Sequence, residues 1–148
     1  MQTFLPYEDF SESAKVLDRL RLGKQRVETF QIAKVVSEVS SGWQNHPAVV
    51  MWKGYPEALL AYQAAVCSEW MSRGYLDTCL EKTFEVLGVD LVLQNELLSE
   101  LLPSWLGHPD FHVSHQSNLL RKDEDWYRRF FPDVSPDLPY FWPVRILR

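Results

Sequence analysis

The sequence lacks any apolar run near the roughly 20 residues that a membrane-spanning helix needs. Its first residues, MQTFLPYEDF, lack the basic start and apolar stretch of a secretory signal. Cysteine is scarce too, because only Cys67 and Cys79 occur among 148 residues. Two cysteines in apolar surroundings favour buried free thiols over a disulfide framework. We therefore expect a cytoplasmic protein that crosses no membrane.

Several familiar catalytic signatures are also missing. The sequence has no G-x-S-x-G elbow, no glycine-rich phosphate loop and no zinc-binding helix motif. If this chain performs covalent chemistry, its nucleophile must therefore be an unconventional one.

Positive charge is in deficit, with 15 Lys and Arg against 20 Asp and Glu, a net charge of −5. This balance argues against a general electrostatic attraction to nucleic acid. The charges are nevertheless segregated: bases gather within residues 19–26 and 121–129, whereas acids gather within residues 81–100. A local basic face is therefore compatible with the acidic total.

Apolar residues, by contrast, are plentiful: 46% of the chain is hydrophobic and 14% is aromatic. This composition is typical of a folded globular protein, and the length suits one domain spanning residues 1–148. The aromatic residues exceed what so small a core requires. We therefore expect some rings to be exposed or to line a cleft.

The pattern of caps and breakers predicts helices and no strands. Pro6 favours an extended start, Ser11 suits a helix cap, and Pro56 and Gly74 suit the first turn and the C-terminal cap of a second long helix. The predicted helices are 12–39 with a bend near Gly23, 56–74, one or two within 77–102, 111–120 and 124–131. A proline-rich irregular tail follows. The fold class predicted is all-α, a compact single-domain helical bundle with an extended N-terminal segment.

The segment RLGKQRVETFQ places four polar residues on one helical stripe, at spacings of three, four and three: Arg21, Lys24, Glu28 and Gln31. One interpretation is a solvated face with a Lys24–Glu28 ion pair worth a few tenths of a kcal/mol, ~0.3. The other is a carboxylate held ionised by neighbouring cations within a patch that binds phosphates.

Three further segments allow two interpretations each. In NHPAVVMWKGY, His46 is either a capped loop residue or, with Asn45, part of a polar pair at a cleft rim flanked by Trp52 and Tyr55. In DEDWYRRFF, aromatic and basic residues interleave, as in surfaces that stack on bases. The alternative for that segment is a buried aromatic anchor with solvated arginines.

The third segment is GHPDFHVSHQSNLLRK. Its histidines His108, His112 and His115 have the spacings of four and three that a helical metal site could use. Pro109 disrupts that register, and no cysteine or carboxylate completes an obvious ligand set. His115, followed by Arg121 and Lys122, suits phosphate contacts better. We expect no metal at these histidines.

Taken together, these segments resemble the phage-type endonuclease V, or pyrimidine-dimer DNA glycosylase, family, and more closely its bacterial branch. The resemblance rests on five segments in order along the chain: MQTFLPY, RLGKQRVE, NHPAVVMWKGY, WMSRGY and HVSHQSNLLRK. They run from Met1 to Lys122, and with one later segment the resemblance covers about nine-tenths of the chain. The later segment WYRRFF is similar to an aromatic–basic segment of the phage enzyme.

The resemblance implies a DNA glycosylase with β-elimination lyase activity that needs no metal and no cofactor. The α-amine of Met1 would attack C1′ and form a Schiff base, and Glu28 would act as the acid and base. An α-amine suits this role because a useful fraction is unprotonated near neutral pH. In the phage branch the initiating Met is removed, whereas here Gln2 is large enough to favour its retention. An alternative register would place Arg26 and Val27 at the catalytic helix positions.

The resemblance also implies a partner, double-stranded DNA carrying a damaged or modified base, bound by a monomer. The residues expected to contact DNA are Arg21, Lys24, Arg26, His46, His115, Arg121, Lys122 and Arg128. A helical module that binds nucleic acid or a protein without catalysis is the alternative function. A metal-dependent hydrolase that uses the three histidines is the third.

Overall fold

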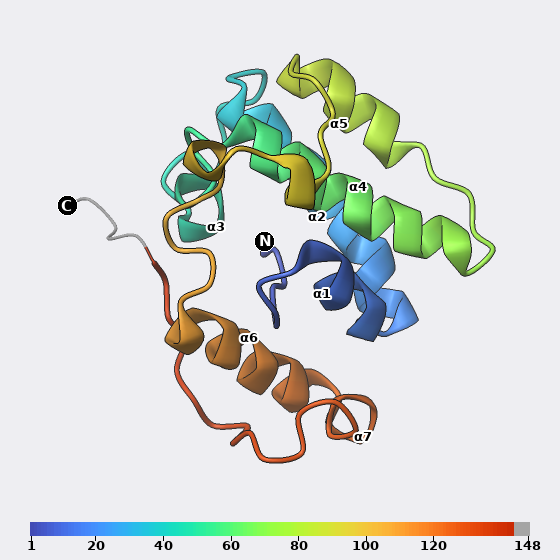
Figure 1. The fold of residues 1–148 in the computed structure, drawn as a ribbon, viewed down its shortest axis with the longest axis vertical. Coiled ribbons are helices and arrows are strands. Elements are labelled where there is room, and N and C mark those ends of the chain that lie inside the picture. The colour runs from blue at the N-terminus through green and yellow to red at the C-terminus, as the bar shows by residue number, and fades with distance from the viewer. Residues whose placement is uncertain (144–148) are drawn as a thin grey trace.

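All regular elements in the described part of the chain are helical. The computed structural model describes residues 1–143. Its α-helices are α1 (Phe10–Val16), α2 (Arg19–Val36), α3 (Pro47–Val50), α4 (Pro56–Ser72), α5 (Cys79–Leu87), α6 (Pro109–Lys122) and α7 (Glu124–Tyr127), shown in Figure 1. Two 3₁₀ turns, Gln94–Glu96 and Ser99–Leu101, lie between α5 and α6. The predicted all-α fold class is confirmed.

The N-terminal segment lies in the middle of the molecule, between the layer formed by α1, α2 and α4 and the helix α6 (Figure 1). Helices α2 and α4 pack against each other, with α1 and α5 beside them. Phe4 and Leu5 are buried in the same core cluster as Leu59 of α4 and Phe111 of α6. The first residues are thus part of the core, and packing on both sides fixes their position.

The predicted long helix from residue 12 to 39 is two helices. It breaks at Asp18, whose backbone is extended (φ −66°, ψ 161°), and not at Gly23. The phenol of Tyr127 holds this break because it accepts from the Asp18 N–H at 3.0 Å and donates to the Asp18 carboxylate. Gly23 lies inside α2, where a Cβ would come within 3.1 Å of the Trp70 ring. The glycine therefore permits close helix packing and causes no bend.

The helices predicted within residues 77–102 are mostly absent. α5 ends at Leu87 because Gly88 adopts a left-handed conformation (φ 64°, ψ 27°) and its N–H bonds to the Phe84 carbonyl. Two short 3₁₀ turns follow it, Gln94–Glu96 and Ser99–Leu101. Helix α1 also starts earlier than predicted, with Asp9 rather than Ser11 as its cap.

Two further expectations concern the cysteines and the membrane. Cys67 and Cys79 are buried free thiols, as the sequence predicts. Within residues 1–143, no helix combines the length and the apolar character that crossing a membrane requires.

Candidate active site

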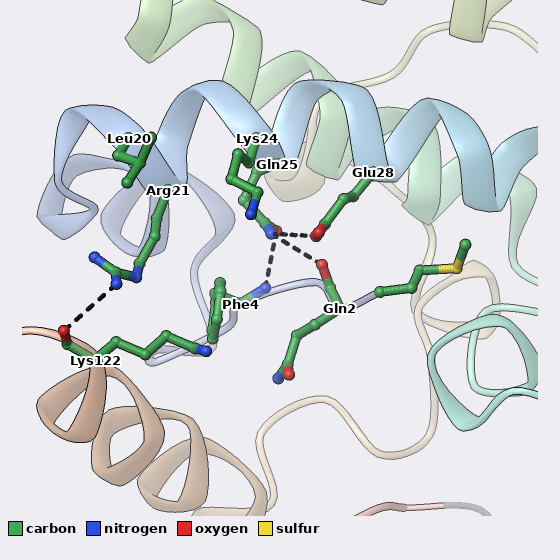
Figure 2. A pocket seen from close by; sticks show the side chains of 9 residues that line it. Gln2, Phe4, Leu20, Arg21, Lys24, Gln25, Glu28 and Lys122 are labelled. Atoms are coloured by element: carbon green, nitrogen blue, oxygen red, sulfur yellow. Dashed lines mark hydrogen bonds between the residues drawn. The ribbon is translucent and has the colours of Figure 1, made fainter.

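The side chain of Gln25, on α2, holds the N-terminal segment in place. This residue is buried, and its Oε1 accepts hydrogen bonds from the Phe4 N–H at 2.9 Å and from the Tyr62 hydroxyl at 2.7 Å. Its Nε2 donates to the Gln2 carbonyl at 2.9 Å. Gln25 thus binds the extended backbone much as a neighbouring strand would, and this contact sets Gln2 beside Glu28 (Figure 2).

Two histidines of α6 hold the same segment from the other side. The Leu5 N–H donates to His115 Nδ1 at 2.9 Å, and His112 Nδ1 lies 2.8 Å from the Leu5 carbonyl. Burial lowers the pKa of His115 to about 3, so its ring is neutral and its proton lies on Nε2. Only 1% of His115 is exposed. The predicted DNA contact by His115 is therefore replaced by a positioning role.

Met1 and Glu28 line a common hollow of about 220 Å³ between α2 and the end of α6. Figure 2 shows Arg21, Lys24 and Lys122 around it. The full lining is Met1, Gln2, Phe4, Leu20, Arg21, Lys24, Gln25, Glu28 and Lys122. Three residues of the predicted stripe on α2, Arg21, Lys24 and Glu28, therefore line one hollow, whereas Gln31 does not.

Glu28 also borders two neighbouring hollows. One is the apolar hollow, formed by Leu20, Val27 and Trp70 on the outer side of α2. The other brings Met1 together again with Glu28, and adds Lys34 and Trp43. Glu28 is thus a lining residue of three hollows.

The carboxylate of Glu28 has few partners of its own. Among residues 1–143, Glu28 forms no ion pair, so the Lys24–Glu28 pair is absent. Its one hydrogen bond is a long contact of 3.4 Å from Gln25 Nε2. Burial raises the pKa of Tyr62 well above its ordinary value, and the negative charge of Glu28 adds to that effect. The carboxylate is therefore close to the N-terminal segment yet free to interact with a ligand.

His46 combines a structural and a local electrostatic role. Its Nδ1 accepts from the Ala48 N–H at 3.0 Å and so caps α3. Burial lowers the pKa of His46, and the positive charge of the N-terminal amine lowers it further. His46 is therefore within electrostatic reach of that amine. Trp52, predicted to flank it at a rim, is instead fully buried and donates to Thr3 Oγ1 at 3.0 Å.

With this geometry established, comparison with known proteins is informative. A family model described as pyrimidine dimer DNA glycosylase matches residues 1–83. The chain belongs to this family. Neither a search of curated proteins nor a search of solved structures gave a match. The matched stretch includes Met1, Glu28 and His46, whereas α6 and α7 lie beyond it.

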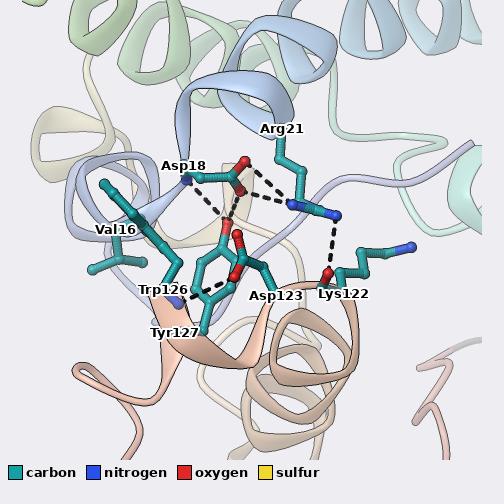
Figure 3. Close-up of polar contacts among 7 residues, drawn as sticks. All are labelled: Val16, Asp18, Arg21, Lys122, Asp123, Trp126 and Tyr127. Carbon is teal, nitrogen blue, oxygen red and sulfur yellow. Dashed lines mark hydrogen bonds and ion pairs between the residues drawn. The ribbon is translucent and has the colours of Figure 1, made fainter.

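Family membership identifies the chain as a DNA glycosylase enzyme of the pyrimidine-dimer type. Of the cations expected to bind DNA in this glycosylase, Lys24 and Lys122 are exposed at the hollow. Arg21 Nη1 lies 3.1 Å from the Asp18 carboxylate, and its Nη2 is 3.5 Å from the Lys122 carbonyl (Figure 3). Arg21 thus links α2 to the end of α6.

Arg26 has a different environment from the other cations. Its Nε lies 3.1 Å from the Asp77 carboxylate, off the hydrogen-bond direction, and its guanidinium stacks over Trp70 at 4.5 Å. Only 13% of its side chain is exposed. The expected DNA contact by Arg26 is therefore corrected to a packing role, because the ion pair and Trp70 already occupy the guanidinium.

Two arginines near the C-terminus hold irregular chain. Arg121 Nη1 donates to the carbonyls of Pro136 and Leu138 at 2.6 and 2.9 Å. Arg128 Nη1 donates to the Val134 carbonyl at 2.7 Å, and its Nη2 pairs with Glu124. Neither residue lines the hollow described above. Their DNA contacts remain predictions. Such contacts would use the guanidinium N–H groups that these bonds do not occupy.

The aromatic–basic segment around α7 serves as an anchor. Trp126 Nε1 donates to the Val16 carbonyl at 2.8 Å, and Tyr127 is fully buried against the Asp18 break (Figure 3). Arg129 stacks over Trp126 at 4.3 Å. The structure thus supports the buried-anchor interpretation of this segment for Trp126 and Tyr127.

The three histidines considered as metal ligands bond to the backbone instead. His108 Nδ1 accepts from the Asp110 N–H, His112 Nε2 accepts from the Gly107 N–H, and His115 bonds to Leu5 as described. No group of three potential ligands converges within residues 1–143.

Sequence reasoning missed two residues of the site, Gln25 and Tyr140. The signal for Gln25 was its place on the core-facing side of α2, where a buried amide requires hydrogen-bond partners. Tyr140, in the tail, donates to Gln2 Oε1. No local pattern predicts that contact, because its partner is 138 residues away.

Proposed function

We propose that this protein cleaves a glycosidic bond of a pyrimidine dimer in double-stranded DNA and then cleaves the strand, with the Met1 α-amine as nucleophile and Glu28 as acid and base. One observation carries the proposal: Met1 and Glu28 line the same hollow, which Lys24, Arg21 and Lys122 surround with positive charge. An amine, a carboxylate and phosphate-binding cations are the groups that this chemistry requires.

The reaction begins at C1′ of the damaged nucleotide. The unprotonated amine forms a bond to C1′ while the bond from C1′ to the base breaks, and the base leaves with the electron pair and gains a proton. The amine nitrogen then loses a proton, the bond from C1′ to the ring oxygen breaks, and that oxygen keeps the electron pair and gains a proton, which gives the Schiff base. The carboxylate of Glu28 would stabilise the positive charge that develops on the sugar as the base leaves.

Strand cleavage follows from the Schiff base. Glu28 takes a proton from C2′, the bond from C3′ to oxygen breaks, and the 3′ phosphate departs with the electrons of that bond. Water then hydrolyses the imine and frees the amine. Every step uses groups of the chain and water, so the proposed reaction consumes no metal or cofactor.

The DNA backbone would lie across the basic side of the hollow. Lys24 and Lys122 are exposed there and Arg21 also lines it, whereas His46 lies within electrostatic reach of the N-terminal amine. Lysine acts on phosphate as a mobile point charge, which suits positioning without sequence readout. A monomer presents all of these groups on one surface. We therefore propose that a single chain binds the damaged strand without sequence preference.

Borohydride trapping tests the mechanism. Duplexes with an abasic site or a cyclobutane pyrimidine dimer are mixed with the protein and reduced, and the cross-linked peptide is identified by mass spectrometry. The expected result is a covalent adduct on the α-nitrogen of Met1. The matched control is the same chain with two residues added before Met1, which keeps the fold and moves the amine out of the hollow.

The opposite result would be informative as well. If a protein with a free N-terminus binds both duplexes but gives no adduct, the catalytic assignment fails and a DNA-binding module takes its place. If the protein cleaves the DNA without forming an adduct, and EDTA abolishes that cleavage, the metal-dependent alternative is favoured.

A further inference from the structure

The tail after α7 returns along α6 and is anchored there. Arg121 donates to the Pro136 and Leu138 carbonyls, and the Leu138 N–H donates to Ser117 Oγ at 3.0 Å. These three bonds fix residues 136–138 to one face of the helix. The residues that follow therefore start from a fixed position on α6, and this anchor restricts the path that they can take.

Beyond this anchor, three consecutive aromatic residues pack around the N-terminal segment. Tyr140 meets the His115 ring edge-on at 5.7 Å and stacks on Trp142 at 5.1 Å. Phe141 stacks on the His108 ring at 4.7 Å. Trp142 in turn meets the edge of the His46 ring at 6.2 Å. The tail thus connects both ends of α6 and the cap of α3.

The Tyr140 hydroxyl donates its hydrogen bond to Gln2 Oε1. Gln2 is consequently held at two points: Gln25 of α2 binds its backbone carbonyl, and the tail binds its side chain. The backbone of Gln2 is joined directly to Met1 through one planar peptide unit. Constraining Gln2 therefore constrains the position of the Met1 amine.

We propose that Tyr140 is a positioning residue that orients the N-terminal nucleophile through Gln2. The inference rests on the proposed function, since it assigns Tyr140 a role in the reaction of that amine. Burial raises the pKa of Tyr140 well above its ordinary value, so the phenol remains a protonated donor throughout the working pH range. The contact is thus present whenever the amine is reactive.

The experiment measures the rate of borohydride-trapped imine formation on an abasic duplex, with enzyme in excess. Tyr140→Phe removes only the hydroxyl, and we expect a rate lower by about tenfold because small misplacements of a nucleophile are costly. DNA affinity and the melting temperature should stay close to wild type, and the pH at half-maximal rate should not move. Tyr75→Phe is the matched control, because Tyr75 stacks on Trp70 and takes no part in the hydrogen bonds that hold Gln2.

A double-mutant cycle separates positioning from a general structural role. Gln2→Leu deletes the same bond from its other end and keeps a large second residue, so Met1 remains in place. If Tyr140 acts through Gln2, the double variant should be no slower than the slower single variant. If instead the two effects multiply, or Tyr140→Phe traps at the wild-type rate, the positioning role is overturned.

The two proposals fail in different ways. An absence of any Met1 adduct in the wild type overturns the proposed function, and the role of Tyr140 with it. A normal wild-type adduct with an unaffected Tyr140→Phe rate overturns the role of Tyr140 alone. Should Tyr140→Phe prove unfolded, Gln2→Leu alone carries the test by the same rate measurement.

Discussion

At the scale of single residues, the site depends on what each polar group is already bonded to. Glu28 has only a long contact from Gln25, whereas the Arg26 guanidinium is occupied by Asp77 and Trp70. The two side chains therefore differ in how much hydrogen-bonding capacity is left for a ligand, although they lie two positions apart in α2. Free hydrogen-bonding capacity therefore separates Glu28, as a candidate for catalysis, from its structural neighbours.

The carboxylate of Glu28 gives the first prediction. Glu28→Gln keeps the shape of the side chain but removes its charge and basicity, so base release should slow by about 10²- to 10⁴-fold, the usual contribution of an acid–base group. Binding to dimer-containing duplex should change little, as measured by fluorescence anisotropy. Glu85→Gln makes the same chemical change on exposed α5 and should have no effect. Equal activity of Glu28→Gln and wild type would remove Glu28 from the mechanism.

The buried ring of His115 gives a pH dependence. Its pKa of about 3 in the folded protein lies below the ordinary 6.5, so protonation favours the unfolded state. Stability is therefore retained above about pH 6.5 and is lost as pH falls toward 3, by up to about 1.4 kcal/mol per pH unit. His115→Asn keeps an acceptor for the Leu5 N–H without a titrating group. In urea unfolding, the stability of this variant should fall less steeply than that of the wild type as the pH is lowered.

At the scale of elements, the decisive contact is between α2 and the N-terminal segment. The residues before Phe10 form no helix, so their backbone groups need partners elsewhere. Gln25 and Tyr62 supply them on one side, and α6 supplies them on the other. The N-terminus is accordingly positioned by tertiary contacts and by no local propensity.

Replacing Gln25 tests this arrangement. Gln25→Leu leaves the Phe4 N–H and the Gln2 carbonyl without their partner, so stability should fall by about 2 to 5 kcal/mol, a sum of two unmade buried bonds. Imine trapping should fall more steeply than the folded fraction, because the amine is no longer held. Gln63→Leu is the matched control: it removes another buried glutamine, bonded to Arg26 O and Thr83, and leaves the N-terminal contacts intact.

A result in which both glutamine variants lose trapping in proportion to their stability would contradict the assigned role of Gln25. Thermal unfolding by circular dichroism, measured on the same samples, supplies the folded fraction for that comparison.

At the scale of the whole molecule, the acidic total conceals a divided surface. Exposed Lys24 and Lys122 come from α2 and α6, two helices brought together at the hollow. Exposed acids gather on α5 and the turns that follow it, at Glu81, Glu85, Asp90, Glu96 and Glu100. We therefore expect a polyanion to be attracted to the side with Lys24 and Lys122 and repelled by the acidic one, which would orient the protein on DNA.

The salt dependence of DNA binding tests that division. Changing Lys24 and Lys122 together to Gln should weaken binding and reduce the slope of log K against log salt by about 0.9 for each phosphate that the variant no longer neutralises. Lys15→Gln with Lys82→Gln removes the same charge from exposed positions on α1 and α5 and should leave the slope unchanged. An unaltered slope in the first variant would place the DNA on another face.

The helical class and much of the site follow from local patterns. Proline and glycine at Pro56 and Gly74 mark the ends of α4, and the period of α2 places Arg21, Lys24 and Glu28 on one face. Such properties depend on neighbours within one or two turns, which is why sequence alone predicts them. The short motifs also predicted the family by resemblance, and the match over residues 1–83 confirms it.

Tertiary packing decided the rest, because helical period assigns a face but not what that face meets. Burial of His115 depends on Leu5, 110 residues away, and the break at Asp18 depends on Tyr127, 109 residues away. Arg26 contacts Asp77 and Trp70, although a contact with DNA was expected from its place in α2. The sequence by itself determined which elements form and which residue types they display. Only the folded chain determined which of those groups are left free, since that depends on partners from distant segments.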